Sequence, residues 1–499
     1  MFVTRPMTKS PSKFRVSAKL GRWWLMAAAA IVLPQLSSLV WWMRTQSTLH
    51  FRGWINGEYL VLFAIGVLFP SRAMVGVLAA ELTLSLLEPI GHLYYFSPSD
   101  AVLSLQYLQY LPAPRLAGYG AFLVAYIILC VVVLAGALGS ERPARGPWIA
   151  AVLILCAVLP IAADAERGRF HAILGLNHRD PDLRSVHVVS APMLSLVAGV
   201  LGKKGVDAPQ RNLRSALGAA MSEIPRDAVP NVVLVLTESW GLSSDARVND
   251  ALTAPYSDAQ IAASYTVQRG TVEFSGGTTH GETRELCGDT RGRNRYADVP
   301  ALAGCWPGQL DRRGYRTLAV HGFAPTMFER KSWYENFGFE ESAFLPELQR
   351  DGVTMCPGAF PGGCDADVMR WISARLMQTP EAGPLFVHWV TLNSHLPVTP
   401  VEVGYEQSGC GAVGLAQGTS LCGWFGRVRI VHQSVGEAAL RAIARDGQRP
   451  TMFVVVGDHA PPFLTAANRD RFSQTRVPFV VLMPRSLSRT SPTRMVASM

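Results

Sequence analysis

Polar groups that could hold a metal ion follow two apolar, strand-like runs in the second half of the chain. Glu238 comes directly after NVVLVLT, and the pair Asp458 and His459 comes directly after TMFVVVG. Between them in the sequence, SGGTTHGETRELCG at 275–288 places the hydroxyl of Thr278 after two glycines. Carboxylate oxygens and an imidazole are ligands for a divalent cation such as Zn²⁺ or Mn²⁺. The combination predicts a metal site.

Each of these features also has a plainer interpretation. A carboxylate after a strand is commonly a helix N-cap, and a Gly-Gly-Thr-Thr stretch is usually a solvated loop. The features are chemically coherent together, because a threonine hydroxyl becomes a good nucleophile only when a base or a metal ion activates it. A cation that binds Thr278 would also stabilise the charge on a phosphoryl oxygen. We therefore expect Thr278 to be both a metal ligand and a nucleophile.

These residues need a scaffold that brings distant segments together. Short apolar runs typical of buried strands occur at 231–237, 317–322, 384–392, 451–457 and 477–484. Helical patterns intervene, among them 365–378, with Asp365 as its expected N-cap, and 427–445. This alternation predicts an α/β domain with an open, mostly parallel sheet, in which ligands bind beyond the carboxyl ends of the strands.

The first third of the chain is far more apolar. Five segments are long enough, or nearly so, to cross a bilayer as helices, at 23–43, 54–70, 73–96, 118–138 and 148–165. The tail at 1–22 carries basic residues and no acidic ones, which places it in the cytoplasm by the positive-inside rule. We predict a polytopic α-helical membrane domain of about five helices at 23–165, although Glu58, Glu81 and Glu88 interrupt its second and third segments.

Five crossings would place the rest of the chain outside the cytoplasm. Residues 166–230 are predicted to be a connector, and 231–499 an extracytoplasmic domain. Within the connector, 185–202 could be a sixth crossing, which would return the domain to the cytoplasm. Pro192 and His187 favour instead a helix on the membrane surface.

Charge and cysteine content constrain the partners and the compartment. The net charge of +9 includes no dense Lys/Arg run, so nucleic acid is excluded as a partner. Cys130 and Cys156 lie in predicted membrane helices, and the other six cysteines are Cys287, Cys305, Cys356, Cys364, Cys410 and Cys422. An even number in an extracytoplasmic domain predicts disulfides, and sequential pairing is the simplest of about fifteen connectivities.

The order of these motifs resembles the membrane-anchored phosphotransferases of the alkaline phosphatase/sulfatase superfamily. They include lipoteichoic acid synthases, glucan phosphoglycerol transferases and lipid A phosphoethanolamine transferases. The synthase pattern Gly-x-Thr-x-x-x-Glu matches Gly276 through Glu282, which selects Thr278 over Thr279 as the nucleophile. The resemblance implies an alkaline-phosphatase-like C-terminal domain with one metal ion, Mn²⁺ or Zn²⁺. The implied metal ligands are Glu238, Thr278, Asp458 and His459.

The resemblance also implies substrate-binding residues. The stretch AVHGFAPTMFER supplies His321, Phe328 and Arg330, with phenylalanine where the synthases have tryptophan, and TLNSHLP supplies His395. Arg330 would bind a phosphate as a bidentate donor, a role that lysine would fill poorly. His388 lies within a predicted strand and is interpreted as a core histidine.

The implied activity is transfer of a phospholipid headgroup to an extracytoplasmic glycan or lipid acceptor through a phosphothreonine intermediate. The donor would be phosphatidylglycerol or, less readily, phosphatidylethanolamine, although Phe328 in place of tryptophan weakens that preference. The implied location is a bacterial inner membrane, crossed several times, with the catalytic domain in the periplasm.

Two alternatives stay open at this point. One is a phosphodiesterase or phosphatase of the same superfamily, and the other is an inactive membrane protein that binds envelope glycans. Sulfate-ester hydrolysis is disfavoured, because the stretch that begins at Cys305 (CWPGQ) lacks the arginine of the Cys-x-Pro-x-Arg motif of sulfatases. The sequence shows no clear second set of Asp/His ligands, which disfavours a two-metal phosphatase.

Overall fold

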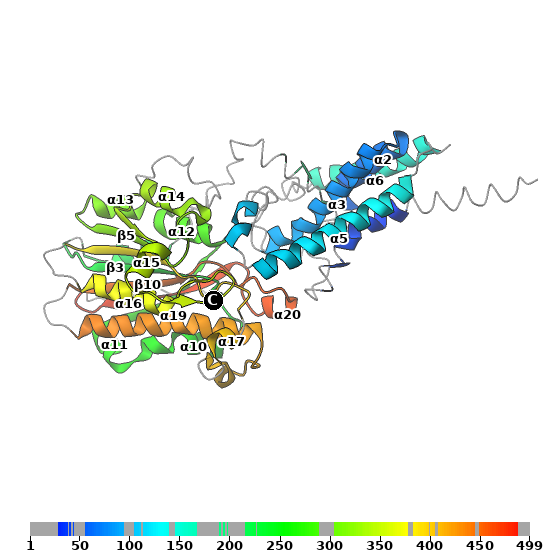
Figure 1. Ribbon diagram of the computed structural model, residues 1–499. Helices are drawn as coiled ribbons and strands as arrows, with labels where there is room; N and C mark the ends of the chain where they lie inside the picture. Colours follow the sequence, from blue (N-terminus) through cyan, green and yellow to red (C-terminus); the bar gives the residue numbers. More distant parts are fainter. Residues whose placement is uncertain are drawn as a thin grey trace, which may run out of the picture. The chain divides into compact units, whose positions relative to one another are not determined.

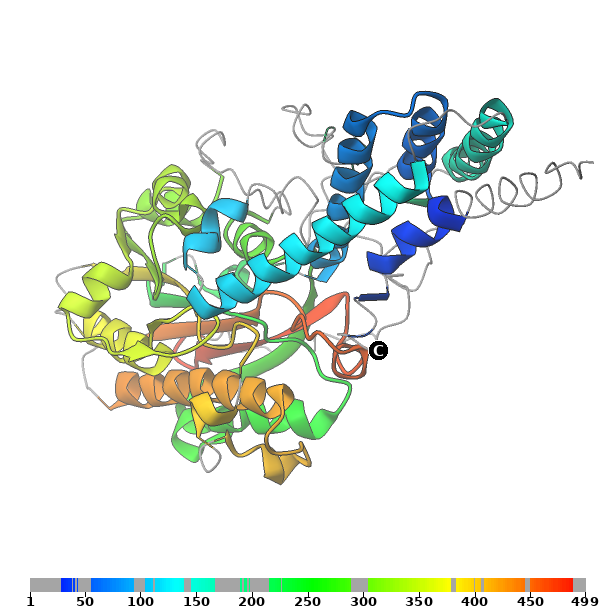
Figure 2. The same ribbon diagram turned by 45° about the vertical axis from the view of Figure 1, so that its right-hand side comes forward.

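A computed structural model describes residues 28–37, 39–40, 43, 55–93, 104–110, 113–138, 145–166, 189–190, 193–194, 197, 215–225, 227–288, 304–377, 383–398, 400–404, 408–444 and 449–487. The chain divides into two compact units, a helical N-terminal unit and a C-terminal α/β unit (Figure 1). The short 3₁₀ turn η1 (Ser104–Tyr110), drawn in sky blue in Figure 2, belongs with the C-terminal unit although its neighbours in the sequence do not.

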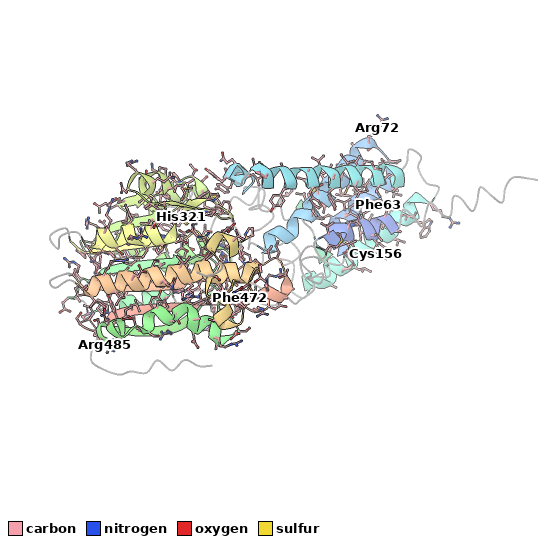
Figure 3. The ribbon with its side chains drawn as sticks, turned by 60° about the horizontal axis from the view of Figure 1, so that its bottom comes forward. Phe63, Arg72, Cys156, His321, Phe472 and Arg485 are labelled. Carbon is pink, nitrogen blue, oxygen red and sulfur yellow. A yellow bond between two sulfur atoms is a disulfide. The ribbon has the colours of Figure 1, made fainter. Side chains whose placement is uncertain are left out.

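Helices occupy part of each of the five predicted membrane segments. They are Ala28–Ser37, α2 (Gly57–Leu68), α3 (Arg72–Leu93), α5 (Ala113–Leu138) and α6 (Gly146–Glu166). Among the described residues, Leu116–Leu138 and Gly146–Ala163 are long and apolar enough to cross a membrane. These two helices support a membrane-associated protein, and the five crossings stay a prediction. Figure 3 labels Phe63 and Cys156 on helices of this unit.

Polar groups at the start of α2 explain why this helix is shorter than the segment 54–70. The side chain of Asn56 caps α2 by accepting a hydrogen bond from Tyr59 N at 2.7 Å. Its amide donates to Glu81 Oε1 at 3.1 Å and to Ser85 Oγ at 3.0 Å, so these buried polar atoms bond to one another.

Part of the predicted connector returns to this N-terminal unit. Strands β1 (Ile55–Asn56) and β2 (Val189–Ser190) pair in parallel, and Glu58 accepts a hydrogen bond from Met193 N at 2.8 Å. Most of the predicted surface helix at 185–202 lies outside the described residues.

The C-terminal unit is built on a seven-stranded sheet in the order β4-β11-β10-β3-β9-β5-β6. Its strands are β3 (Asn231–Thr237), β4 (Tyr265–Glu273), β5 (Arg316–His321), β6 (Glu341–Ala343), β9 (Leu385–Val390), β10 (Thr451–Gly457) and β11 (Arg476–Pro484). The five strands from β10 to β6 are parallel, whereas β11 and β4 form an antiparallel edge. The predicted mostly parallel sheet is confirmed, and the two strands without a predicted counterpart are β4 and the short β6.

Helices cover both faces of this sheet. Figure 1 shows α12 (Thr278–Cys287), α13 (Trp306–Asp311) and α14 (Arg330–Phe337) on one face, with α10 (Ala246–Thr253), α11 (Ala259–Ser264), α16 (Asp365–Leu376) and α19 (Ser420–Ile443) on the other. The shorter helices are α9 (Ala216–Glu223), α15 (Leu345–Arg350), α17 (Pro400–Val403) and α20 (Ala466–Arg469). Covered on both faces, β3 and β10 are buried along their whole length, which is why they read as continuous apolar runs.

Two helix starts differ from their predictions. Helix α19 begins at Ser420 and not at 427. The N-cap of α16 is Cys364, and Asp365 is the first residue inside the helix. The side chain of Asp365 bonds to a different segment of the chain, at Leu392 and Asn393.

The six cysteines of the C-terminal unit form three bridges in sequential order. The pairs are Cys287–Cys305, Cys356–Cys364 and Cys410–Cys422. The predicted disulfides are confirmed, and their connectivity, which the sequence left open, is the sequential one. Bridges over short loops such as these typically contribute about 2–4 kcal/mol each. Cys130 and Cys156 in the helical unit are free thiols.

A buried histidine on α19 predicts a pH-dependent stability. His432 is fully buried beside Tyr256, and burial lowers its pKa to about 3. Because this pKa lies below that of an exposed histidine, the unfolded chain takes up the proton first as the pH falls from about 6.5 towards 3. Because of this histidine, we expect the free energy of unfolding to fall by about 1.4 kcal/mol for each pH unit of acidification in that window. Denaturant unfolding of His432→Gln at pH 7, 6 and 5 should show a pH dependence that is shallower by this amount, and identical slopes would contradict it.

Candidate active site

The stretch at 275–288 contains the whole of α12 and is not a solvated loop. Gly277 is the N-cap of α12, and Thr278 is the first residue of the helix. Gly276 has a φ of +77°, and a Cβ there would lie 2.4 Å from the ring of His280. Only glycine fits position 276 without strain, so this turn helps to set the position at which the Thr278 hydroxyl leaves the backbone.

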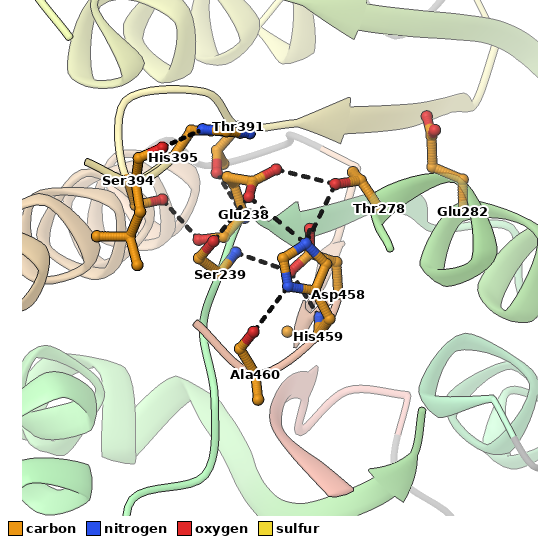
Figure 4. A network of polar contacts seen from close by, with 12 residues as sticks. Glu238, Ser239, Thr278, Glu282, Thr391, Ser394, His395, Asp458, His459 and Ala460 are labelled. Atoms are coloured by element: carbon orange, nitrogen blue, oxygen red, sulfur yellow. Dashed lines mark hydrogen bonds and ion pairs between the residues drawn. The ribbon is translucent and has the colours of Figure 1, made fainter. Parts of the chain in front are cut away.

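The four predicted metal ligands come together at the carboxyl ends of two neighbouring strands (Figure 4). Thr237 at the end of β3 pairs with Gly457 at the end of β10, so the residues that follow these strands are adjacent. One side-chain atom from each of Glu238, Asp458 and His459 lies within 4.8 Å of the others.

Thr278 completes this cluster from the first turn of α12. Its hydroxyl donates to Glu238 Oε2 at 3.0 Å and lies 3.4 Å from His459 Nε2. The segments that contribute these groups are far apart in the sequence, and the sheet brings them to one edge.

The imidazole of His459 is oriented as a metal ligand would be. Its Nδ1 lies 2.9 Å from the carbonyl oxygen of Ala460, which can only accept, so Nδ1 carries a proton. In the neutral ring, the lone pair of Nε2 then faces Asp458 Oδ2 at 3.3 Å and Glu238 Oε1 at 3.6 Å. Three acceptors that converge in this way fit a bound cation.

The electrostatics of the two carboxylates also fit a cation. Glu238 is 4% exposed and Asp458 is 1% exposed. Burial and then the negative charge of Glu238 raise the pKa of Asp458 well above its ordinary value. Burial opposes ionisation of Glu238 as well, but the nearby imidazoles of His395 and His459 hold its pKa below the ordinary value. A divalent cation would relieve the repulsion between two carboxylates in so little water.

Two residues that the sequence analysis missed hold the predicted ligands in place. Ser239 has a φ of +57°, and from this strained conformation its N–H donates to Asp458 Oδ1 and its hydroxyl to Glu238 Oε1, both at 2.7 Å. Buried Arg284 on α12 donates to Gly457 O at 2.7 Å and thereby ties the helix of Thr278 to β10. The only sequence signal for Ser239 is its place next to Glu238.

Two predicted substrate-binding histidines come from β5 and from the loop that follows β9. His321 ends β5, and its Nδ1 hydrogen-bonds with Val390 O at 3.0 Å. Burial and then the positive charge of Arg330 lower its pKa to about 3, so His321 is neutral near pH 7. His395 follows β9 and its ring packs edge-on against Phe360, with centroids 4.8 Å apart.

Arg330 makes its closest described contacts away from the Thr278 cluster. Its guanidinium pairs with Glu282 at 3.2 Å, and both side chains are buried. Tyr334 donates to the same carboxylate at 2.6 Å, and His388 Nε2 lies 3.5 Å from it. Burial alone would raise the pKa of Glu282. The positive charge of Arg330 is the chief opposing cause, and the pKa is lowered to about 2. In Figure 4, Glu282 stands apart from the Thr278 cluster, and the phosphate contact of Arg330 stays a prediction.

Phe328 contacts a segment that the sequence analysis did not connect with the site. The ring of Tyr107 in η1 lies 5.2 Å from that of Phe328, and Tyr110 lies 5.5 Å from Phe323. Phe328 has a φ of +53°, and the guanidinium of Arg330 lies 5.3 Å from its ring. The C-terminal unit therefore includes a segment, η1, that lies in the sequence between two predicted membrane helices.

The family follows from the sequence of this domain. A family model described as Sulfatase matches residues 230–498, more than half of the chain. The chain belongs to the sulfatase family. This membership places it in the alkaline phosphatase superfamily and confirms the resemblance seen in the motifs.

Individual relatives are distant. The capsular polysaccharide biosynthesis protein RkpI of Rhizobium meliloti is 29% identical over 195 residues, which are 38% of this chain and 30% of that protein. The alignment therefore spans less than a third of the relative's length.

Several solved structures are similar to this chain at low identity. The lipoteichoic acid synthase LtaP of Listeria monocytogenes is 16% identical, with a TM-score of 0.40 over 56% of this chain and 68% of that one. The phosphoglycerol transferase GacH of Streptococcus pyogenes is 17% identical, with a TM-score of 0.38 over 53% and 71%. The lipooligosaccharide phosphoethanolamine transferase EptA of Neisseria meningitidis is 13% identical, with a TM-score of 0.46 over 86% and 81%.

Membership of the family does not make sulfate esters the substrate. Cys305 is the cysteine nearest in pattern to the sulfatase motif, and it is bonded to Cys287. A cysteine in a disulfide is not available for conversion to formylglycine, which agrees with the missing arginine after it.

Proposed function

We propose that this protein transfers the headgroup of a phospholipid to an acceptor outside the cytoplasm, with Thr278 as the nucleophile. The observation that carries the proposal is the position of the Thr278 hydroxyl, 3.0 Å from Glu238 and 3.4 Å from His459. A hydroxyl at the first turn of a helix, aimed at a buried group of metal ligands, is the arrangement needed to activate an alcohol for attack on phosphorus.

The proposed reaction has two steps. Thr278 Oγ attacks the headgroup phosphorus, the bond from phosphorus to the diacylglycerol oxygen breaks, and the proton of the hydroxyl ends on that oxygen. The headgroup is then held as a phosphodiester of Thr278. In the second step an acceptor hydroxyl forms the new bond to phosphorus, the bond from phosphorus to Thr278 Oγ breaks, and the acceptor's proton returns to Thr278. Glu238, Asp458 and His459 would hold one Mn²⁺ or Zn²⁺ together with Thr278. When bound, the cation supplies Lewis-acid stabilisation of the charge on oxygen.

The donor and the acceptor are proposed from weaker signals. His321, Phe328, Arg330 and His395 would bind phosphoglycerol or, less readily, phosphoethanolamine. The name of the rhizobial relative, a capsular polysaccharide biosynthesis protein, favours a glycan over a lipid acceptor. The two apolar helices and the three disulfides support a membrane enzyme whose catalytic domain faces an oxidising compartment, such as a bacterial periplasm.

Incubation with labelled phospholipids tests this proposal. Purified full-length protein with Mn²⁺ or Zn²⁺ should release diacylglycerol from phosphatidylglycerol, and less from phosphatidylethanolamine. Label that appears on an added glycan indicates transfer, and label that appears as free glycerol phosphate indicates a hydrolase. If neither lipid yields diacylglycerol with any divalent metal, the proposed donor is wrong.

A further inference from the structure

The backbone of Glu238 is held by the loop that follows β9. Glu238 N donates to Thr391 Oγ1 at 2.9 Å, and Ser394 Oγ donates to Glu238 O at 2.6 Å. Both hydroxyl residues are buried, and the next residue along is His395. The position of the Glu238 carboxylate therefore depends on the conformation of residues 391–395.

That loop is in turn fixed by one carboxylate from a different part of the chain. Asp365 Oδ1 accepts from Leu392 N at 3.0 Å, and Asp365 Oδ2 accepts from Asn393 N at 2.8 Å. The side chain of Asn393 makes two hydrogen bonds in return. Its Oδ1 accepts from Asp365 N at 2.8 Å, and its Nδ2 donates to Gly363 O at 3.1 Å. Asp365 is 2% exposed and Asn393 is 6% exposed, so water does not compete for these four hydrogen bonds, which we call the clasp.

The residues before Asp365 form a small, rigid hairpin. Strands β7 (Met355–Cys356) and β8 (Gly362–Gly363) pair antiparallel, and the Cys356–Cys364 bridge closes them. Gly363 N donates to the carbonyl of Gly322, the residue after His321, at 2.8 Å.

The hairpin lies so close to both site loops that it needs glycine. A Cβ on Gly362 would lie 2.3 Å from a methyl group of Leu392 and 2.5 Å from Gly322 O. The hairpin thus contacts the two segments that carry the predicted substrate histidines, at Gly322 and at Leu392.

We propose that Asp365, through its clasp with Asn393, is a positioning residue that holds the loop 391–395 and thereby the metal ligand Glu238. The effect of this positioning on metal binding and catalysis rests on the proposed function, in which Glu238 is a metal ligand. An acidic residue in the first turn of a helix usually serves that helix. Both carboxylate oxygens of Asp365 instead accept hydrogen bonds from N–H groups of another segment. Because its lone pairs point at two buried amides, replacing one oxygen by an NH₂ group leaves an amide unpaired.

The test compares two isosteric changes in one helical turn. Asp365→Asn replaces one of the two accepting oxygens of the clasp and leaves one loop amide unpaired. Asp367→Asn is the matched control, because the described contacts of Asp367 are with Thr354 and Arg370 and not with the loop. For Asp365→Asn we expect the dissociation constant for Mn²⁺ or Zn²⁺ to rise about tenfold, in the range seen when partners of metal ligands are lost. The control should stay within about twofold of the wild type.

A second readout does not depend on turnover. Hydrogen exchange followed by mass spectrometry on the metal-free full-length protein should show faster exchange in the peptide that covers 391–396 for Asp365→Asn only. A change confined to global stability would speed exchange throughout the domain. If Asp365→Asn does not fold, Asn393→Ala tests the same clasp, since it removes the acceptor for Asp365 N and the donor to Gly363 O.

The outcomes separate this inference from the proposed function. Equal metal affinities for Asp365→Asn and Asp367→Asn, or unchanged exchange at 391–396, would overturn the positioning role. If the wild type binds no divalent metal and releases no diacylglycerol, the proposed function fails, whereas the exchange experiment still decides whether the clasp holds the loop.

Discussion

Thr278→Ala should abolish turnover of the labelled phospholipid while leaving the domain folded. The change removes one hydroxyl and one methyl group from the first turn of α12, and Gly277 remains as the N-cap. Loss of an ordinary hydrogen bond costs about 0.5–1.5 kcal/mol, which is roughly a tenfold effect on a rate. Loss of the nucleophile of a two-step transfer should instead remove at least about three orders of magnitude. Diacylglycerol release per enzyme, with metal in excess, measures the difference.

Thr279→Ala is the matched control for this variant. Thr279 is the next residue of the same turn and is 5% exposed, and none of the described hydrogen bonds joins its side chain to the cluster. It should retain most of the activity. Trapping with labelled lipid should give a phosphopeptide over 275–284 in the wild type and none in Thr278→Ala. An adduct on Thr279 would move the nucleophile by one residue, and the absence of any adduct would argue against a covalent intermediate.

The parts of the site that the sequence predicted are those set by strand ends. Glu238 and Asp458 each follow an apolar run, and parallel strands that are buried on both faces have little freedom in where they end. The register between β3 and β10 then brings the two carboxylates together. The apolar run was sufficient to predict these positions, because the point at which each strand ends is set within that strand.

Other features could not be predicted from the sequence, because they depend on contacts between distant segments. The polar run at 278–287 reads as a loop, yet it folds as α12 because Arg284 and Glu285 have buried partners, among them Gly457 O and Leu217 N. Helix propensity and periodicity carry no information about such partners. The polar residues were visible in the sequence, but the groups that satisfy them were not.

The antiparallel edge strand and the turn η1 were missed for related reasons. Strand β4 gives a weaker signal than the buried strands, because it lies at the edge of the sheet and only Tyr265 and Val272 in it are buried. Tyr107 in η1 packs against Phe328, a contact between segments more than two hundred residues apart that no spacing rule relates. Asp365 likewise reads as an N-cap, and only the fold shows that its carboxylate bonds to Leu392 and Asn393.

Asp458→Asn should have opposite effects on the metal-free and metal-bound protein. Asparagine keeps an oxygen to accept from Ser239 N and His459 N, but it removes the charge that repels Glu238 in the buried site. We therefore expect the metal-free variant to unfold at the same temperature as the wild type or above it. The wild type should gain about 2.7 kcal/mol when Mn²⁺ or Zn²⁺ is present at one hundred times its dissociation constant, and the variant should gain almost nothing at that concentration.

Metal content and thermal unfolding, measured together, decide whether Asp458 is a ligand. Elemental analysis should show about one divalent ion for each wild-type chain and strong depletion in Asp458→Asn, with phospholipid turnover lost in parallel. Asp470→Asn is the control, because Asp470 is an exposed carboxylate at the end of α20, and it should keep both the metal and the thermal shift. A variant at Asp458 that retains full metal content and the full metal-dependent shift would show that the cation binds elsewhere. An unchanged metal content with lost turnover would instead make Asp458 a catalytic group that does not hold the ion, because removing a true ligand charge from so buried a site must weaken the cation's binding.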